Sequence, residues 1–344
     1  MIFSENAHQT SESGCRFAFA SIRQWTRIAL FVATVLFVVV FEKFGHGQQV
    51  TTGIGDDLWE LSTRHLPCSA CGQSTVPAFD VHRFTNCRWE KRTLDEAVNG
   101  AADSGPVPLT ILYVHGNWME RDNALERVRI INGYISKQAC EPYRMIMFSW
   151  PSQRDNRIIR DVRDNAKCAD AEAYYFARLL QAVSASSARV SVLGFSFGSR
   201  TVSGGLHLDA GGTISGVPCL EVPGHSQYRV SLVAPAVDRD WLQANGRHHM
   251  AMNHVDSLVN LYNSRDPILR RFRFVDSIAR PIAAGFAGFE AVANPRATTP
   301  LIGSDRIQQY DCGSQIGTTH SELDYYGKCQ HFRKAIDNVL WKTP

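Results

Sequence analysis

The sequence predicts an α/β fold: a mainly parallel β-sheet with helices on both faces, preceded by an N-terminal apolar helix. Short, almost wholly apolar runs recur along the chain, as in strands that are buried on both faces. Segments with apolar residues at helical spacing separate these runs. Such alternation favours parallel strands that are joined by right-handed helical crossovers.

The expected elements follow one another from residue 57 to the C-terminus. Strands are expected at 57–65, 78–84, 109–114, 145–148, 190–193, 230–234, 258–262 and 306–312. Helices are expected at 121–137, 161–183 and 332–341. The segment 274–294 is rich in Ala, Gly and Phe and is interrupted by Pro281. We expect it to form either a helical cap over a pocket or a packed connecting helix.

The composition is that of a globular protein rather than of a nucleic-acid-binding one. The chain has 344 residues, of which 44% are hydrophobic and 20% are charged. Its formal net charge is only +3, and no dense stripe of Lys and Arg occurs. We divide the chain into a polar segment (1–27), an apolar segment (28–44), a region of strands and loops with a C-x-x-C motif (45–104) and the main α/β domain (105–344).

The apolar segment predicts export from the cytoplasm. Residues 28–41 carry no charge, and Arg16, Arg23 and Arg27 precede them. Such a run is short for a bilayer span and suits the core of a signal peptide, although a tilted anchor over 28–44 could still cross the membrane. The arginines favour a cytoplasmic N-terminus. We expect a membrane-anchored protein whose main domain is extracytoplasmic; the alternative is secretion after signal cleavage.

The cysteines fit an exported protein. Nine are present, and all but Cys15 follow the apolar segment. These eight are Cys68, Cys71, Cys87, Cys140, Cys168, Cys219, Cys312 and Cys329. An even number favours structural disulfides, but the pairing does not follow from the sequence. The C-x-x-C pair, Cys68 and Cys71, could instead form a metal or redox site, yet only Cys87 lies near enough in the chain to add a ligand.

One short motif points to a nucleophile. Gly194-Phe195-Ser196-Phe197-Gly198 follows an apolar strand and precedes a helical segment. In a strand-to-helix turn of this kind, the serine takes a strained backbone conformation and its hydroxyl is lifted clear of the sheet. The glycines let strand and helix pack closely. The alternative is a glycine-rich turn with an incidental serine.

The other groups needed for acyl transfer also follow strands. Sites in parallel sheets form at the carboxyl ends of strands. Asp266 follows 258–262 and His320 follows 306–312. Together with Ser196 they supply a nucleophile, a base and an orienting acid, which is a catalytic triad. Asp238 and His331 are the rivals of the acid and the base; we expect Asp238 to cap a helix starting near Trp241, and His331 to start the last helix.

The ordered motifs resemble the α/β-hydrolase superfamily, and in particular a poorly characterised branch that carries VHGxN, WPS, GxSxGxR, YxSxxD and a late His. The matching blocks are Val114 to Asn117, Phe148 to Ser152, Gly194 to Arg200, Val233 to Asp238, Tyr262 to Asp266, and His320. The resemblance covers about residues 105 to 335. It departs from the branch at Phe195 and Phe197, where the branch has His and Met, and this puts the shape of the pocket in doubt.

The resemblance implies a nucleophile elbow at Ser196 and an α/β-hydrolase domain over 105–344. It also implies an oxyanion hole made by the backbone N–H groups of Phe197 and Asn117, with Trp118 as the neighbouring possibility. The wall of the site would include His115, Gly116, Trp118 and Trp150. Neither a cofactor nor a metal is expected.

We therefore expect an exported serine esterase or lipase-like enzyme. Its substrate would be a small or lipid-like acyl compound with an ester, thioester or amide bond. The expected partners are this substrate and, through the N-terminal helix, a membrane, but no nucleic acid. The alternative is a catalytically silent α/β-hydrolase domain that binds a ligand at the cell surface.

Overall fold

The computed structural model describes residues 55, 57–68, 77–99, 109–153, 158–218, 224, 226–275, 280–290 and 306–342. The chain divides into two units, Met1–His46 and Gly47–Pro344, and the described residues all lie in the second. The predicted polar and apolar N-terminal segments lie outside the described residues. Among the helices that are described, none is long and apolar enough to span a bilayer. The signal or anchor role of 28–44 therefore stays a prediction.

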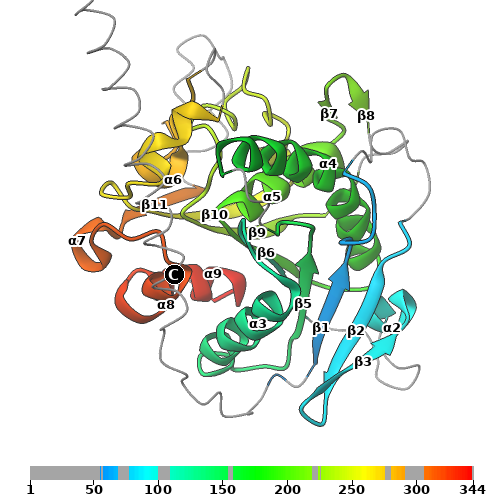
Figure 1. Ribbon diagram of the computed structural model, residues 1–344. Helices are drawn as coiled ribbons and strands as arrows, with labels where there is room; N and C mark the ends of the chain where they lie inside the picture. Colours follow the sequence, from blue (N-terminus) through cyan, green and yellow to red (C-terminus); the bar gives the residue numbers. More distant parts are fainter. Residues whose placement is uncertain are drawn as a thin grey trace, which may run out of the picture. The chain divides into compact units, whose positions relative to one another are not determined.

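The second unit is built on a twisted nine-stranded sheet with the strand order β11-β10-β9-β6-β4-β5-β1-β2-β3 (Figure 1). Its strands are β1 (Leu58–Ser62), β2 (Asp80–Thr85), β3 (Arg88–Arg92), β4 (Thr110–Val114), β5 (Arg144–Ser149), β6 (Val190–Phe195), β9 (Tyr228–Val233), β10 (Val255–Tyr262) and β11 (Ile307–Asp311). Neighbouring strands from β11 to β1 are parallel, and β2 pairs antiparallel with both of its neighbours. A separate small hairpin joins β7 (Thr213–Ile214) to β8 (Val217–Pro218).

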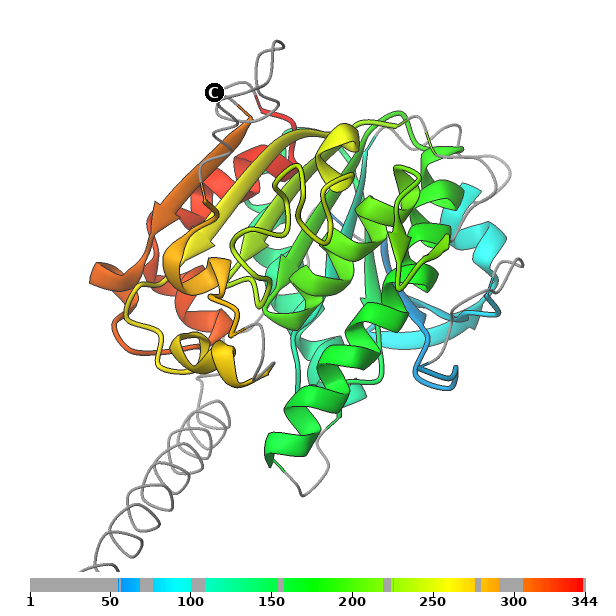
Figure 2. The ribbon, with the colours of Figure 1, turned by 90° about the horizontal axis from the view of Figure 1, so that it is seen from above.

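Helices cover both faces of the sheet, as Figures 1 and 2 show. The long α4 (Ile158–Ser184) and α5 (Phe197–Asp209) pack together over one face; α3 (Arg121–Ser136), α8 (Glu322–Lys328) and α9 (Phe332–Val339) lie over the other. Every residue of β4, β5 and β6 is buried. Their apolar runs therefore form the core, and the predicted mainly parallel α/β fold is confirmed.

The smaller helices connect these layers. They are α2 (Leu94–Asn99), η1 (Ala251–His254), η2 (Leu269–Phe274), α6 (Ala284–Ala287) and α7 (Gly313–Ile316). Helix α2 was not expected from the sequence, although Thr93 and Glu96 form a capping box at its start. Strand β3 was not expected either; it follows β2 through a turn with positive φ at Asn86 and Cys87.

Two expectations about domain organisation change. The region 45–104 supplies β1, β2 and β3 to the sheet of the main domain, because β1 pairs in parallel with β5. Within the residues described, the segment 274–294 contains the last residue of η2, Phe274, and the one-turn helix α6. The carbonyl of Gly285 in α6 accepts the N–H of Asn263, so this part is a packed connection rather than a helical cap.

Candidate active site

Ser196 stands at a sharp turn between β6 and α5. Its φ is +52° and its ψ is −119°, a conformation that is costly for a residue with a Cβ. The backbone holds it there because its N–H donates to the carbonyl of Val233 and its own carbonyl accepts the N–H of Ala236. The strained turn predicted for this serine is therefore present.

Glycines allow the chain to approach this turn closely. A Cβ on Gly198 would overlap the backbone carbonyls of Val114 and His115, so only glycine lets α5 begin against the end of β4. A Cβ on Gly116 would lie 2.7 Å from Cδ1 of Phe195. The expected close packing around the elbow is thus real, and it brings the loop after β4 beside Ser196.

The structure brings Ser196, His320 and Asp266 together. Oγ of Ser196 lies 3.0 Å from Nε2 of His320, and Nδ1 of His320 lies 2.6 Å from Oδ2 of Asp266. Asp266 is fully buried, and the His320 side chain is 13% exposed. The carboxylate accepts from Nδ1, so it orients the ring with its Nε2 lone pair toward the serine hydroxyl.

Both Asp266 and the loop of His320 are held by the chain around them. The second oxygen of Asp266 accepts the N–H groups of Ile268 (2.8 Å) and Leu269 (3.0 Å). Nδ2 of Asn263 donates to the carbonyls of Gly317 (2.9 Å) and Thr319 (3.0 Å), just before His320. From the sequence, Asn263 was only one residue of the block Tyr262 to Asp266, and this contact was not expected.

The rival residues lie elsewhere. Oδ1 of Asp238 accepts the N–H groups of Arg239 and Ile282, so this carboxyl ties two loops together. The expected helix near Trp241 is absent from residues 239–250, which form turns, and the expected role of Asp238 as its cap is wrong. His331 is the N-cap residue of α9, as expected, and its ring stacks on Tyr310.

The loop after β4 contains Asn117 of the predicted oxyanion hole and His115, Gly116 and Trp118 of the predicted site wall, whereas Phe197 begins α5 and Trp150 follows β5. His115 and Trp150 are fully buried, and their rings stack with centroids 5.8 Å apart. They therefore support the loop from within. Trp118 has a φ of +56°, and Oδ1 of Asn117 accepts a hydrogen bond from Asn165 on α4. Asn165 was not singled out from the sequence.

His115 is neutral in this arrangement. The backbone N–H of Trp150 (3.3 Å) and the guanidinium of Arg64 (3.2 Å) both face its Nε2, which must accept. Nδ1 then carries the proton and donates to the carbonyl of Gly116. Burial, followed by the positive charge of Arg64, holds the pKa of His115 well below its usual value. The buried, neutral His115 thus supports the loop through these hydrogen bonds.

The cysteines form two disulfides among the described residues, Cys68–Cys168 and Cys312–Cys329, which confirms that disulfides are present. Cys87 and Cys140 are exposed free thiols, whereas Cys15, Cys71 and Cys219 lie outside the described residues. The second disulfide closes the chain segment that carries His320.

In the described part of the chain, a carboxylate oxygen of Glu172 and the sulfurs of Cys68 and Cys168 are the only donors grouped closely enough for a metal. Those sulfurs are bonded to each other here.

Comparisons with known proteins leave the family open. No protein-family model and no curated protein matches this sequence. The chain is similar in structure to an inhibited esterase B from Lactobacillus rhamnosis, with a TM-score of 0.40, 11% identity, and coverage of 91% of this chain and 93% of that one. For a butyrate-bound esterase of Thermogutta terrifontis, the TM-score is 0.31, the identity 12%, and the coverage 69% and 83%. Scores at this level carry no argument about function.

Proposed function

We propose that this chain is a serine hydrolase that cleaves an ester or a related acyl bond through an acyl-serine intermediate. The observation that supports it is the pair of short contacts from Ser196 to His320 and from His320 to Asp266. A strained serine at the carboxyl edge of a parallel sheet, in line with a base and a buried acid, is the arrangement that activates a hydroxyl.

In the proposed reaction, Oγ of Ser196 attacks the carbonyl carbon while Nε2 of His320 takes its proton. The negative charge of Asp266 stabilises the imidazolium that forms. The backbone N–H groups of Phe197 and Asn117 receive the oxyanion. His320 then returns the proton to the departing alcohol, and the acyl group remains on Ser196. Water, activated by the same base, releases the acid and restores the serine.

Membership of the α/β-hydrolase superfamily is part of this proposal. Nucleophile, acid and base follow β6, β10 and β11 in that chain order, as expected for such enzymes. Phenylalanines precede and follow the serine in the chain: the ring of Phe195 lies 5.3 Å from that of His320, and the ring of Phe197 lies 6.5 Å from that of Phe272. These rings favour an apolar acyl group, which fits a small or lipid-like ester.

A fluorophosphonate probe tests the proposal, because it reacts only with an activated serine. We expect labelling of the wild-type protein at Ser196, identified by peptide mass spectrometry, and hydrolysis of short-chain p-nitrophenyl esters. The matched control is Ser152→Ala, since the buried Ser152 hydroxyl contacts the backbone of Met119. Ser196→Ala should abolish labelling and Ser152→Ala should preserve it. A folded protein that neither labels nor hydrolyses esters would instead be the silent binding domain.

We also propose that the hydrolase domain is extracytoplasmic, either anchored by 28–44 or released by signal cleavage. Arg16, Arg23 and Arg27 before the apolar run support this orientation, and two disulfides fit an oxidising compartment. The test adds protease to cells with an intact cytoplasmic membrane, after any outer membrane or cell wall has been made permeable. We expect the protease to digest the domain. Protection until that membrane is broken would contradict the proposal.

A further inference from the structure

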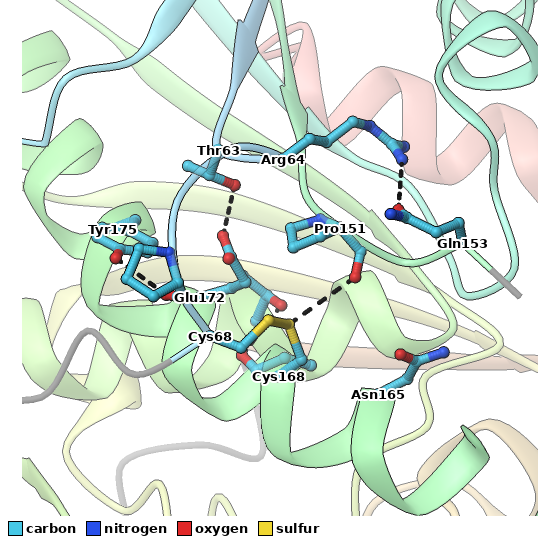
Figure 3. The surroundings of a disulfide bond; sticks show 12 residues. Thr63, Arg64, Cys68, Pro151, Gln153, Asn165, Cys168, Glu172 and Tyr175 are labelled. Carbon is cyan, nitrogen blue, oxygen red and sulfur yellow. Dashed lines mark hydrogen bonds between the residues drawn. A yellow bond between two sulfur atoms is a disulfide. The ribbon is translucent and has the colours of Figure 1, made fainter. Parts of the chain in front are cut away.

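The disulfide Cys68–Cys168 joins two segments that lie 100 residues apart in the chain (Figure 3). Cys68 follows β1 and is exposed, whereas Cys168 lies on α4 and is only 5% exposed. The pair is therefore asymmetric: a thiol from solvent would attack at Cys68, the exposed residue, and the sulfur of Cys168 would leave into the protein interior. Exchange at such a bond proceeds by attack on the accessible sulfur.

A buried carboxyl group lies beside this disulfide. Glu172 is one turn after Cys168 on α4, is fully buried, and has a carboxylate oxygen within 4.8 Å of both sulfurs. Its Oε2 accepts a hydrogen bond of 2.6 Å from the hydroxyl of Thr63. Its Oε1 is buried and has no hydrogen-bond partner among the residues that the structure describes. A carboxylate left in this state would be costly, whereas a carboxylic acid holds a proton beside the sulfur atoms.

Burial raises the pKa of Glu172 to about 8. The opposing influences are the hydrogen bond from Thr63 and the positive charge of Arg64, which both lower it. Tyr175, whose own pKa is raised by burial and by Glu172, is the other titratable group that faces the carboxyl. Glu172 is therefore protonated at neutral pH.

We propose that Cys68–Cys168 is a thiol-exchange site at which the carboxyl group of Glu172 donates a proton to the departing sulfur of Cys168. A dithiol reductant attacks Cys68 as a thiolate, and a mixed disulfide forms between the two. The bond between Cys68 and Cys168 breaks, and its electron pair goes to Cys168, which takes the proton of Glu172. The second thiolate of the reductant then displaces Cys68. The reductant leaves oxidised, and the protein holds two reduced cysteines.

Contacts besides the disulfide also join the two segments. The hydroxyl of Tyr175 on α4 donates to the carbonyl of Pro67, and Thr63 remains bonded to Glu172. The other disulfide differs in both respects that matter. Cys312 and Cys329 are both buried, and no carboxylate or histidine of the described residues is grouped with their sulfurs.

Opening the bond would also loosen the two segments that hold the loop after β4. Arg64, four residues before Cys68, contacts Nε2 of His115 and donates to the carbonyl of Met119. Asn165, three residues before Cys168, donates to Asn117. This consequence rests on the proposed function, since it matters for catalysis only if that loop supplies an oxyanion donor.

Reduction by dithiothreitol under native conditions tests the exchange site, with differential alkylation and peptide mass spectrometry reporting each disulfide separately. Wild type and Glu172→Gln are compared from pH 6.5 to 9, so that ionisation of the reagent cancels in their ratio. We expect Cys68–Cys168 to open at least about tenfold faster in wild type below pH 8, with the advantage disappearing above it. Cys312–Cys329 is the internal control and should open slowly and equally in both proteins.

Thr63→Val is the second variant, because it keeps the carboxyl and removes a hydrogen bond that lowers its pKa. Thr63→Val should open Cys68–Cys168 faster than Glu172→Gln does, and this difference should persist to a higher pH than it does for the wild type. Equal opening rates of Cys68–Cys168 in wild type and Glu172→Gln at pH 7 would overturn the proposal. In a parallel assay on ester substrate, opening should lower the rate about tenfold or more. Unchanged hydrolysis would overturn the coupling to the loop, whereas a complete lack of hydrolysis before reduction would count against the proposed function and not against the exchange site.

Discussion

Nδ2 of Asn263 donates hydrogen bonds to the carbonyls of Gly317 and Thr319, and so ties the end of β10 to the loop that carries His320. Oδ1 of the same side chain accepts the N–H of Arg265. Because Asp266 lies on that turn, one buried amide fixes the acid and the base of the candidate triad relative to each other. In the proposed reaction we therefore expect Asn263 to act as a positioning residue.

Asn263→Ala should lower kcat for ester hydrolysis by about 10²-fold, because loss of both donors lets His320 drift from Ser196. KM should change little, since Asn263 contacts no substrate in the proposed mechanism. Steady-state kinetics on a p-nitrophenyl ester measures both. The variant's circular dichroism and unfolding midpoint serve as the control for folding, and a folded variant with wild-type kcat would contradict the positioning role.

Asp266→Asn should lower kcat by about 10⁴-fold while preserving the fold. Its Oδ1 can still accept the N–H groups of Ile268 and Leu269, but an amide NH₂ then faces Nδ1 of His320. The ring is forced to carry its proton on Nε2, where it cannot accept the proton of Ser196.

Asp238→Asn is the matched control, because its Oδ1 can keep the same two backbone bonds. We expect kcat within a few-fold of wild type and a change in the free energy of unfolding of about 1 kcal/mol or less. Kinetics and urea titration measure the two quantities. Loss of turnover in Asp238→Asn with retention in Asp266→Asn would reverse the assignment of the acid.

Glu172 should make the stability of the oxidised protein depend on pH. Its pKa rises from 4.5 in the unfolded chain to about 8 in the fold, so the folded state holds a proton that the unfolded state releases. The bound proton stabilises the folded state. This stabilisation is complete below pH 4.5, and it decreases by about 1.4 kcal/mol per pH unit until the pH reaches about 8.

Glu172→Gln removes this titration. The free energy of unfolding of the variant, relative to wild type, should rise steadily between pH 5 and pH 8 and level off above. Burial lowers the pKa values of His115 and His248, so these residues also make the free energy of unfolding depend on pH. Their effect is the same in both proteins and cancels in the difference. Urea unfolding without reductant at several pH values provides the measurement; a difference that does not change with pH would show that Glu172 is ionised in the folded protein.

The sequence by itself determined the order of the elements and the residues of the candidate triad. Apolar runs in β4, β5 and β6 predicted buried parallel strands, and parallel strands place their carboxyl ends at one edge. The residues that follow these strands therefore included Ser196, His320 and Asp266 as candidates, with Asp238 as the rival of the acid. The glycine pattern around Ser196 predicted the strained turn, because local sterics alone require it.

Only the tertiary structure decided the contacts that support this site. Cys68 pairs with Cys168 rather than with the nearby Cys71, since α4 packs across the sheet and brings a residue 100 positions away beside it. Arg64 reaches His115 across 51 positions for the same reason. Such pairings depend on how helices settle on the sheet, and no local pattern in the chain encodes that distance. The roles of Asn263 and Glu172 follow from packing in the same way.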